Sequence, residues 1–164
     1  MSKKEVAELR KFLTVFEPKI QKTVLWLRDF AWDLYPNANE LIYDNYNAVA
    51  FGWSPTDRVG HVFCSVAAMR RSNNIHFGFY WGSELSDPKK MLLGEGNQYR
   101  YILVTDKKEF PKAYITKLVK EAYANSLAKV KDKKQLMQGA TIVKSVSAKK
   151  AKRTIKKTER KKAK

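Results

Sequence analysis

Apolar residues recur at three- and four-residue steps in two segments near the N-terminus, which is the spacing of one face of an α-helix. In the first segment these residues are Val6, Leu9, Leu13 and Phe16. The second segment, residues 18–34, opens on Pro18, which suits a first helical turn because proline lacks an amide hydrogen that would stay unpaired there. The pattern stops at Pro36. It predicts two amphipathic helices, each with an apolar face that another layer has to cover.

Short runs of β-branched and aromatic residues, separated by turn residues, replace the helical period in the middle of the chain. They predict strands over residues 47–53, 59–69, 75–81 and 99–104, and a short piece at 40–43 can precede them. The first three of these strands follow each other through short connections. This order predicts a mainly antiparallel sheet of about four to six strands.

A third helical stripe follows the strands, from Pro111 to Leu127. Helices thus bracket the strands along the chain, which favours an α+β fold with the helices packed on one face of the sheet. We expect residues 1–134 to form this domain. Residues 135–147 contain Gly139 and show little periodicity, so we expect a linker there.

The side chains of the strand at 75–81 alternate between the two faces of the predicted sheet. Phe77, Phe79 and Trp81 share one face, and His76 and Tyr80 share the other. If the helices cover only one face, the second keeps a shallow, semi-polar surface. Such a surface can bind a small ligand, a protein partner or a second copy in a homodimer.

The basic charge is concentrated at the C-terminus. The chain has a formal net charge of +17, and residues 144–164 hold 11 basic residues and one acidic residue, which leaves +7 for the rest. Residues 148–164 are almost wholly Lys, Arg, Ala and Thr, so they cannot bury a core and are expected to form a disordered tail. The basic residues assigned to nucleic-acid binding are Lys149, Lys150, Lys152, Arg153, Lys156, Lys157, Arg160, Lys161, Lys162 and Lys164.

This charge density matches that of a polyanion, so counter-ion release should drive non-specific binding of nucleic acid through its phosphates. The tail has no aromatic residue that could stack on a base. A tail that only increases solubility is one alternative. An anionic membrane surface is another, although Ile155 alone gives no apolar face that could insert.

The sequence nominates no enzyme and no metal site. It lacks the nucleophile-elbow, P-loop and His-Glu-x-x-His motifs. Cys64, the only cysteine, lies in a predicted strand, where a buried, inert thiol is commoner than a nucleophile. His61 stands three residues before Cys64, so on a strand the two side chains face opposite ways. We therefore expect no cofactor, and the lack of a disulfide favours the cytoplasm.

Residues 76–100 resemble the signature of the YdhG-like domain family. The matching residues are His76-Phe77-Gly78-Phe79-Tyr80-Trp81-Gly82-Ser83-Glu84-Leu85-Ser86-Asp87-Pro88, then Leu92-Leu93-Gly94-Glu95-Gly96, then Arg100. Glu40, Tyr43 and the strand Ala50-Phe51-Gly52-Trp53 resemble an earlier segment of the family pattern. The resemblance covers the chain from Phe12 to Leu127. It implies a fold similar to frataxin, in a mostly uncharacterised family of which at least one member is proposed to chaperone iron.

The signature has two interpretations. It can be architectural, because its glycines allow close chain approach and Asp87-Pro88 starts a turn. It can also form the wall of a pocket over the sheet, with Arg100 binding an anion and an aromatic side chain stacking on the ligand. The candidate ligand-binding residues are His76, Tyr80, Trp81, Asp87 and Arg100.

Three functional hypotheses follow. The first is a non-enzymatic binding module with a tail that binds nucleic acid. The second is a frataxin-like iron chaperone, in which iron would be bound, but the carboxylates of Asp29, Asp33 and Asp44 are interspersed with basic residues. The third is an enzyme with a pocket near Trp81 and Arg100. No apolar run approaches the roughly 20 residues of a membrane span, so no such span is expected.

Overall fold

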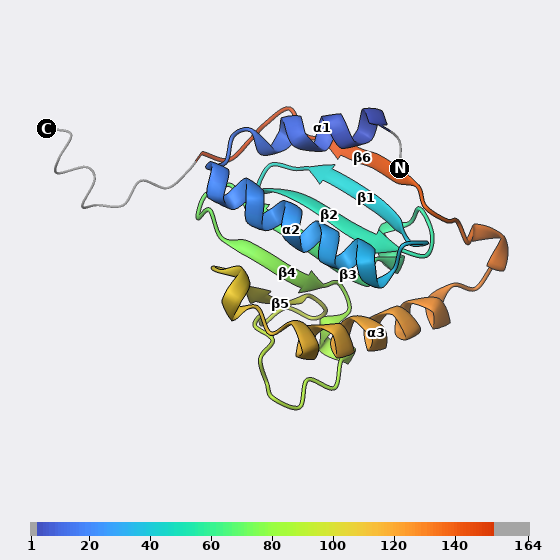
Figure 1. Ribbon diagram of the computed structural model, residues 1–164. Helices are drawn as coiled ribbons and strands as arrows, with labels where there is room; N and C mark the ends of the chain where they lie inside the picture. The colour runs from blue at the N-terminus through green and yellow to red at the C-terminus, as the bar shows by residue number, and fades with distance from the viewer. Residues whose placement is uncertain (1–2, 153–164) are drawn as a thin grey trace, which may run out of the picture.

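The structure of this α+β protein, a computed structural model, describes residues 3–152. Its helices are α1 (Lys3–Leu13), α2 (Pro18–Leu34) and α3 (Lys112–Lys129). Its strands are β1 (Asn39–Asp44), β2 (Ala48–Ser54), β3 (Cys64–Met69), β4 (Ile75–Phe79), β5 (Arg100–Leu103) and β6 (Thr141–Val146). The fold class predicted from the hydrophobic pattern is confirmed, with the helices packed over one face of the sheet (Figure 1).

The strands form one sheet in the order β5-β4-β3-β2-β1-β6. Neighbours from β5 to β1 are antiparallel, whereas β6 runs parallel to β1, so the sheet is mixed. In the β3–β4 hairpin His76 lies opposite Ala67. This register places Ala50, Ala67 and His76 side by side on three neighbouring strands.

Strand β6 differs from the expected linker at 135–147. Ile142 lies opposite Leu41 of β1, and the amide of Glu40 donates a hydrogen bond to the carbonyl of Ala140 at 2.8 Å. The strand is short and its partner lies about a hundred residues earlier, so neither helical nor alternating periodicity within the segment reveals it. The last strand of the described chain therefore completes the sheet beside the first.

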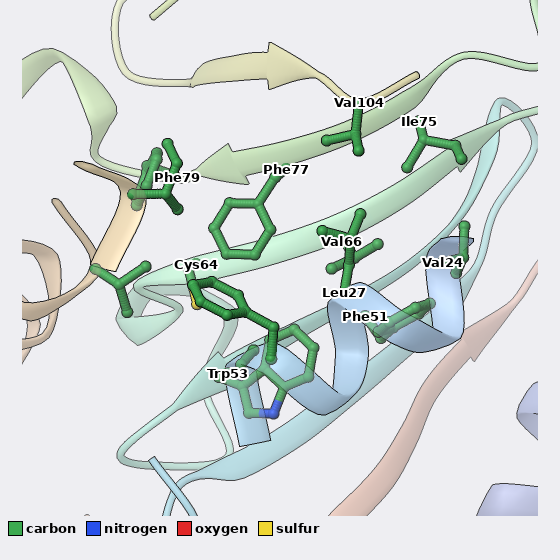
Figure 2. Close-up of a cluster of buried hydrophobic side chains, with 14 of the residues drawn as sticks. Val24, Leu27, Phe51, Trp53, Cys64, Val66, Ile75, Phe77, Phe79 and Val104 are labelled. Carbon is green, nitrogen blue, oxygen red and sulfur yellow. The ribbon is translucent and has the colours of Figure 1, made fainter. Parts of the chain in front are cut away.

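The hydrophobic core lies between the helices and the sheet. Figure 2 shows strand side chains, among them Phe51, Trp53 and Phe77, gathered against Val24 and Leu27 of α2. All five are fully buried. Phe77 and Phe79 lie in this core, as the alternation of β4 predicts. The opposite face of β4 is therefore the one that carries His76.

A buried ion pair joins α2 to the sheet. The guanidinium of Arg28 donates to both carboxylate oxygens of Glu40, at 2.6 and 2.8 Å. The hydroxyl of Thr141 donates to the same carboxylate at 3.3 Å, which ties in β6. Glu40, part of the resemblance to the YdhG-like family, is thus held inside the fold and is unavailable to a ligand.

In the described part of the chain, no helix has the length and apolar character needed to cross a bilayer.

Candidate functional site

A hollow lies on the sheet face that the helices leave open, and we call it the aromatic hollow. Its volume is about 390 Å³. It is lined by Ala50, Ser65, Ala67, Met69, His76, Tyr80, Gln98 and Tyr99. The hollow exists because small side chains occupy neighbouring positions on β2 and β3, while larger ones rise around them from β4 and from the segment before β5. Its volume is within the range of about 300–1,000 Å³ that is usual for small-molecule sites.

Stacked aromatic rings form one side of the aromatic hollow. The His76 ring lies parallel to the Tyr101 ring, with centroids 4.0 Å apart, and the Tyr99 ring also stacks on Tyr101, with centroids 5.6 Å apart. Tyr80 meets Tyr99 edge to face at 6.2 Å. The Tyr99 ring can lie over β4 because residue 78 is glycine, where a Cβ would overlap that ring. The rings therefore support each other and present a rigid wall.

Several polar groups at the aromatic hollow form no hydrogen bond to any residue between 3 and 152. They are the ring nitrogens of His76, the hydroxyl of Tyr80 and the side-chain amide of Gln98. Burial lowers the pKa of His76, so its imidazole is neutral at pH 7 and offers one donor and one acceptor. A ligand in the hollow can satisfy these groups.

Tyrosine hydroxyls around the hollow stay protonated. Burial, with a contribution from nearby Tyr80, raises the pKa of Tyr43 to about 12. The Tyr43 hydroxyl is buried and has no hydrogen-bond partner in the described chain. Burial also raises the pKa of Tyr99, although a hydrogen bond with Ser65 opposes the shift. These groups are therefore neutral at pH 7 and can act as hydrogen-bond donors.

The structure brings together two of the five candidate ligand-binding residues, His76 and Tyr80. Trp81 lies beyond the end of β4, where its indole donates to the carbonyl of Gly60 at 2.9 Å and the Lys129 ammonium lies 4.8 Å from its ring centroid. The Arg100 guanidinium donates to the carbonyls of Gly96 and Tyr99. Trp81 and Arg100 do not line the aromatic hollow.

Asp87 also lies apart from the hollow and organises the crossover between β4 and β5. Its carboxylate accepts hydrogen bonds from the amides of Met91 and Leu92, each at 3.0 Å, and from the hydroxyl of Tyr114. Burial alone would raise the pKa of Asp87, but these three hydrogen bonds outweigh it and lower the pKa. The geometry around Asp87 thus supports the architectural interpretation of the signature.

The other reactive side chains are engaged in the fold. Cys64 is fully buried in the core, and burial raises the pKa of its thiol, which makes it inert (Figure 2). The Thr56 hydroxyl lies 2.7 Å from Nδ1 of His61 and accepts from the amide of Arg58, so this pair closes the connection between β2 and β3. Between residues 3 and 152 no three His, Cys, Asp or Glu side chains gather as a possible metal site.

The start of the basic tail is attached to the domain. The Lys150 ammonium pairs with the Asp44 carboxylate at 3.0 Å and donates to the Asp44 carbonyl at 2.8 Å. Ala151 is buried, and its amide donates to the carbonyl of Tyr46 at 2.7 Å. Lys149 and Lys152 are exposed. The remaining tail residues assigned to nucleic-acid binding, from Arg153 to Lys164, lie outside the described residues.

Six lining residues of the aromatic hollow were not among the candidates from the sequence: Ala50, Ser65, Ala67, Met69, Gln98 and Tyr99. The sequence does carry a signal for the three on β3. Ser65, Ala67 and Met69 alternate on the face opposite the core residue Val66, and a small residue beside an exposed aromatic one favours a hollow. Gln98 lies in the irregular segment before β5, whose path the sequence does not specify. Tyr99 was expected to open a strand over residues 99–104, but β5 begins one residue later, at Arg100.

Comparisons of this chain with protein-family models, with curated protein sequences and with solved structures find no match.

Proposed function

We propose that this protein is a non-enzymatic binding module that holds a small, planar heteroaromatic molecule in the aromatic hollow. One observation carries the proposal: a floor of small side chains lies beside stacked rings and beside polar groups that have no partner within residues 3–152. A flat ring fits the floor of Ala50 and Ala67. Its edge can exchange hydrogen bonds with His76 and Gln98.

The energetics of this arrangement favour an aromatic ligand. Contact with an aromatic side chain is worth about 0.5–1.5 kcal/mol beyond the burial of apolar area. The rings of Tyr80 and Tyr99 are already held by their neighbours, so little side-chain entropy is lost when a ligand binds. The hollow should therefore select a rigid ring over a flexible aliphatic chain.

The same geometry favours binding over catalysis. A reaction by nucleophilic or acid–base chemistry needs an activated nucleophile or a paired acid and base at the ligand. The lining of the hollow has one imidazole, which is stacked on Tyr101, and no carboxylate. The Ser65 hydroxyl is engaged with Tyr99. An enzyme that uses Trp81 and Arg100 remains the alternative, and both of these side chains are occupied by the fold.

Titration of the full chain with adenosine, indole and quinoline, followed by amide chemical shifts in NMR spectra, tests the proposal. We expect at least one probe to shift the amides of residues around Ala67 and His76. Ala67→Leu fills the floor, and Tyr80→Leu removes the hydroxyl and ring while keeping an apolar side chain. Each should weaken binding at least about tenfold, a loss of 1.4 kcal/mol.

The matched control is Leu136→Ala, which changes an exposed side chain that does not line the hollow. This control variant should bind the probe with the same affinity as the unchanged protein. If no probe shifts the amide signals of residues that line the hollow, or if both hollow variants bind as tightly as the control, the proposed ligand class is wrong. A spectrum that instead reports self-association through this face would favour a homodimer.

We also propose that the C-terminal tail binds nucleic acid non-specifically, because its basic residues continue from the exposed Lys149 and Lys152. The test compares the full chain with a chain that ends at Lys152, which keeps the contacts of Lys150 and Ala151 with the domain. Duplex DNA should bind the full chain more tightly and with a steeper dependence on salt. Equal affinity and equal salt dependence would contradict this role.

The predictions of a YdhG-like identity, a cytoplasmic location and a homodimer are retained as hypotheses. The iron-chaperone alternative gains no support from the carboxylates considered for it. Asp44 is buried and paired with Arg70 and Lys150, while Asp29 and Asp33 are exposed on α2. An iron titration in which Asp29→Asn and Asp33→Asn leave the affinity unchanged would remove the role for these carboxylates.

A further inference from the structure

Three shallow hollows lie around the start of α2, the β3–β4 turn and the segment that follows β5. Their volumes are about 300, 270 and 360 Å³. The first two share Asn73 of the β3–β4 turn, and the last two share Lys19, Thr23 and Thr105. They therefore adjoin one another, and we call the three together the basic groove.

The lining of the basic groove is strongly cationic. Its basic side chains are Lys19, Lys22, Arg70, Lys107, Lys150 and Lys152. Its acidic ones are Glu17 and Asp106, and the carboxylate of Asp106 accepts a hydrogen bond from the amide of Lys108. The lining thus carries a formal excess of four positive charges at neutral pH.

The positive charge of the groove is largely available to a ligand. Arg70 and Lys150 are held by Asp44. Lys19, Lys22, Lys107 and Lys152 are exposed and form no ion pair with a carboxylate in the described chain. The first turn of α2 lies at the groove, so the positive end of the helix dipole adds to the positive electrostatic potential of the lysines there.

We propose that the basic groove binds the phosphate backbone of duplex nucleic acid. The inference rests on the proposed function of the tail and adds a fixed binding surface on the domain. Lys150 and Ala151, at the start of the tail, form part of the wall of the groove and are held there by the domain. A polyanion in the groove therefore lies next to the point where the tail begins. Exposed lysines line three adjoining hollows, so they can contact several phosphates of one duplex.

The test neutralises three exposed lysines of the groove, with Lys19→Gln, Lys22→Gln and Lys107→Gln combined. The matched control combines Lys117→Gln, Lys120→Gln and Lys131→Gln, three exposed lysines outside the groove. Binding of a short duplex DNA by fluorescence anisotropy is measured across a salt series, for the full chain and for the chain that ends at Lys152. Urea unfolding of each variant establishes that the fold is retained.

The groove variant should bind more weakly than the control in both chain lengths. Its plot of log affinity against log salt should be shallower by about two to three units, since each lost phosphate contact removes about 0.9. If the groove variant and the control behave alike while removal of the tail weakens binding, the groove proposal is wrong and the tail proposal stands. If removal of the tail changes nothing while the groove variant binds DNA more weakly, the tail proposal is wrong and the groove proposal stands. Binding to phosphatidylserine vesicles but not to DNA would overturn both.

Discussion

At the scale of single residues, Asp87 is the side chain on which the crossover between β4 and β5 depends. It has a positive φ of 33°, and its carboxylate accepts hydrogen bonds from two backbone amides and from the Tyr114 hydroxyl. These hydrogen bonds lower its pKa, so its folded pKa lies below its unfolded one. The stabilisation from Asp87 is therefore present above the unfolded pKa and is lost as the pH falls through the folded pKa.

We expect Asp87→Asn to lower the free energy of unfolding by about 1–2 kcal/mol at pH 7, because an amide is a weaker acceptor for these donors. The difference between the two proteins should begin to shrink as the pH falls below about 3.9, the ordinary pKa of an aspartate, and should continue to shrink until the pH falls below the lowered pKa of folded Asp87. Urea unfolding at pH 7 and pH 3 measures both values. Asp57→Asn, at an exposed position, is the control. An equal loss at both pH values would show that charge is not the cause.

The candidate residues divide by the kind of reasoning that selected them. His76 follows from strand alternation, which is a local rule and holds within β4. Tyr80, the first residue after β4, still shares the face of His76, whereas Trp81 lies further into the turn and the rule no longer applies to it. The donors of Arg100 are directed to carbonyls of its own loop, a geometry that residue types alone do not specify.

At the scale of elements, the packing of the segment before β5 on β4 depends on Gly78. A Cβ at this position would overlap the ring of Tyr99, which forms part of the wall of the aromatic hollow. The atoms in the way belong to the far end of a side chain. The ring can therefore turn aside while β4 keeps its pairing with β3 and β5.

We expect Gly78→Ala to fold but to weaken the binding of a planar probe in the aromatic hollow by about tenfold, the effect of losing one good aromatic contact. The overlap should also cost about 1–3 kcal/mol of stability. Gly60→Ala is the matched control, since a Cβ at residue 60 meets no atom within 4 Å. Probe titration and urea unfolding of both variants supply the comparison. Unchanged binding in Gly78→Ala would mean that Tyr99 does not shape the site.

The elements differed in how far the sequence predicted them. The helical stripes of α2 and α3 run over 17 and 18 residues, long enough for the 3.6-residue period to identify them. The strand expected at 59–69 begins only at Cys64, because Val59–His61 forms a 3₁₀ turn. The β-branched residues of β6 favour a strand, but its pairing with β1 is a non-local interaction that no pattern within residues 141–146 specifies.

At the scale of the whole molecule, the first tail residues are part of the folded domain. Lys150 adds a second cation to Asp44, which is otherwise paired only with Arg70 among the described residues. Ala151 is buried at the β1–β2 turn. The boundary between domain and tail, expected at residue 148, therefore lies beyond Ala151.

A chain that ends at Ser147 should be less stable than one that ends at Lys152 by about 1–2 kcal/mol, the value of one or two partly buried polar contacts. The chain that ends at Lys152 keeps the contacts of Lys150 and Ala151 and is therefore the reference for this comparison. Urea unfolding of the two chains at equal ionic strength measures this. Equal stability of the two truncated chains would show that the contacts of Lys150 and Ala151 contribute nothing to the fold.

The parallel pairing of β6 with β1 also bears on how the chain is made. During synthesis on the ribosome, β1 to β5 and all three helices emerge before residues 141–146 do. Until then, the β1 edge offers unpaired amides and carbonyls to any other extended chain. The nascent protein thus passes through a stage in which aggregation competes with closure of its own sheet, and arrival of the last strand ends that exposure.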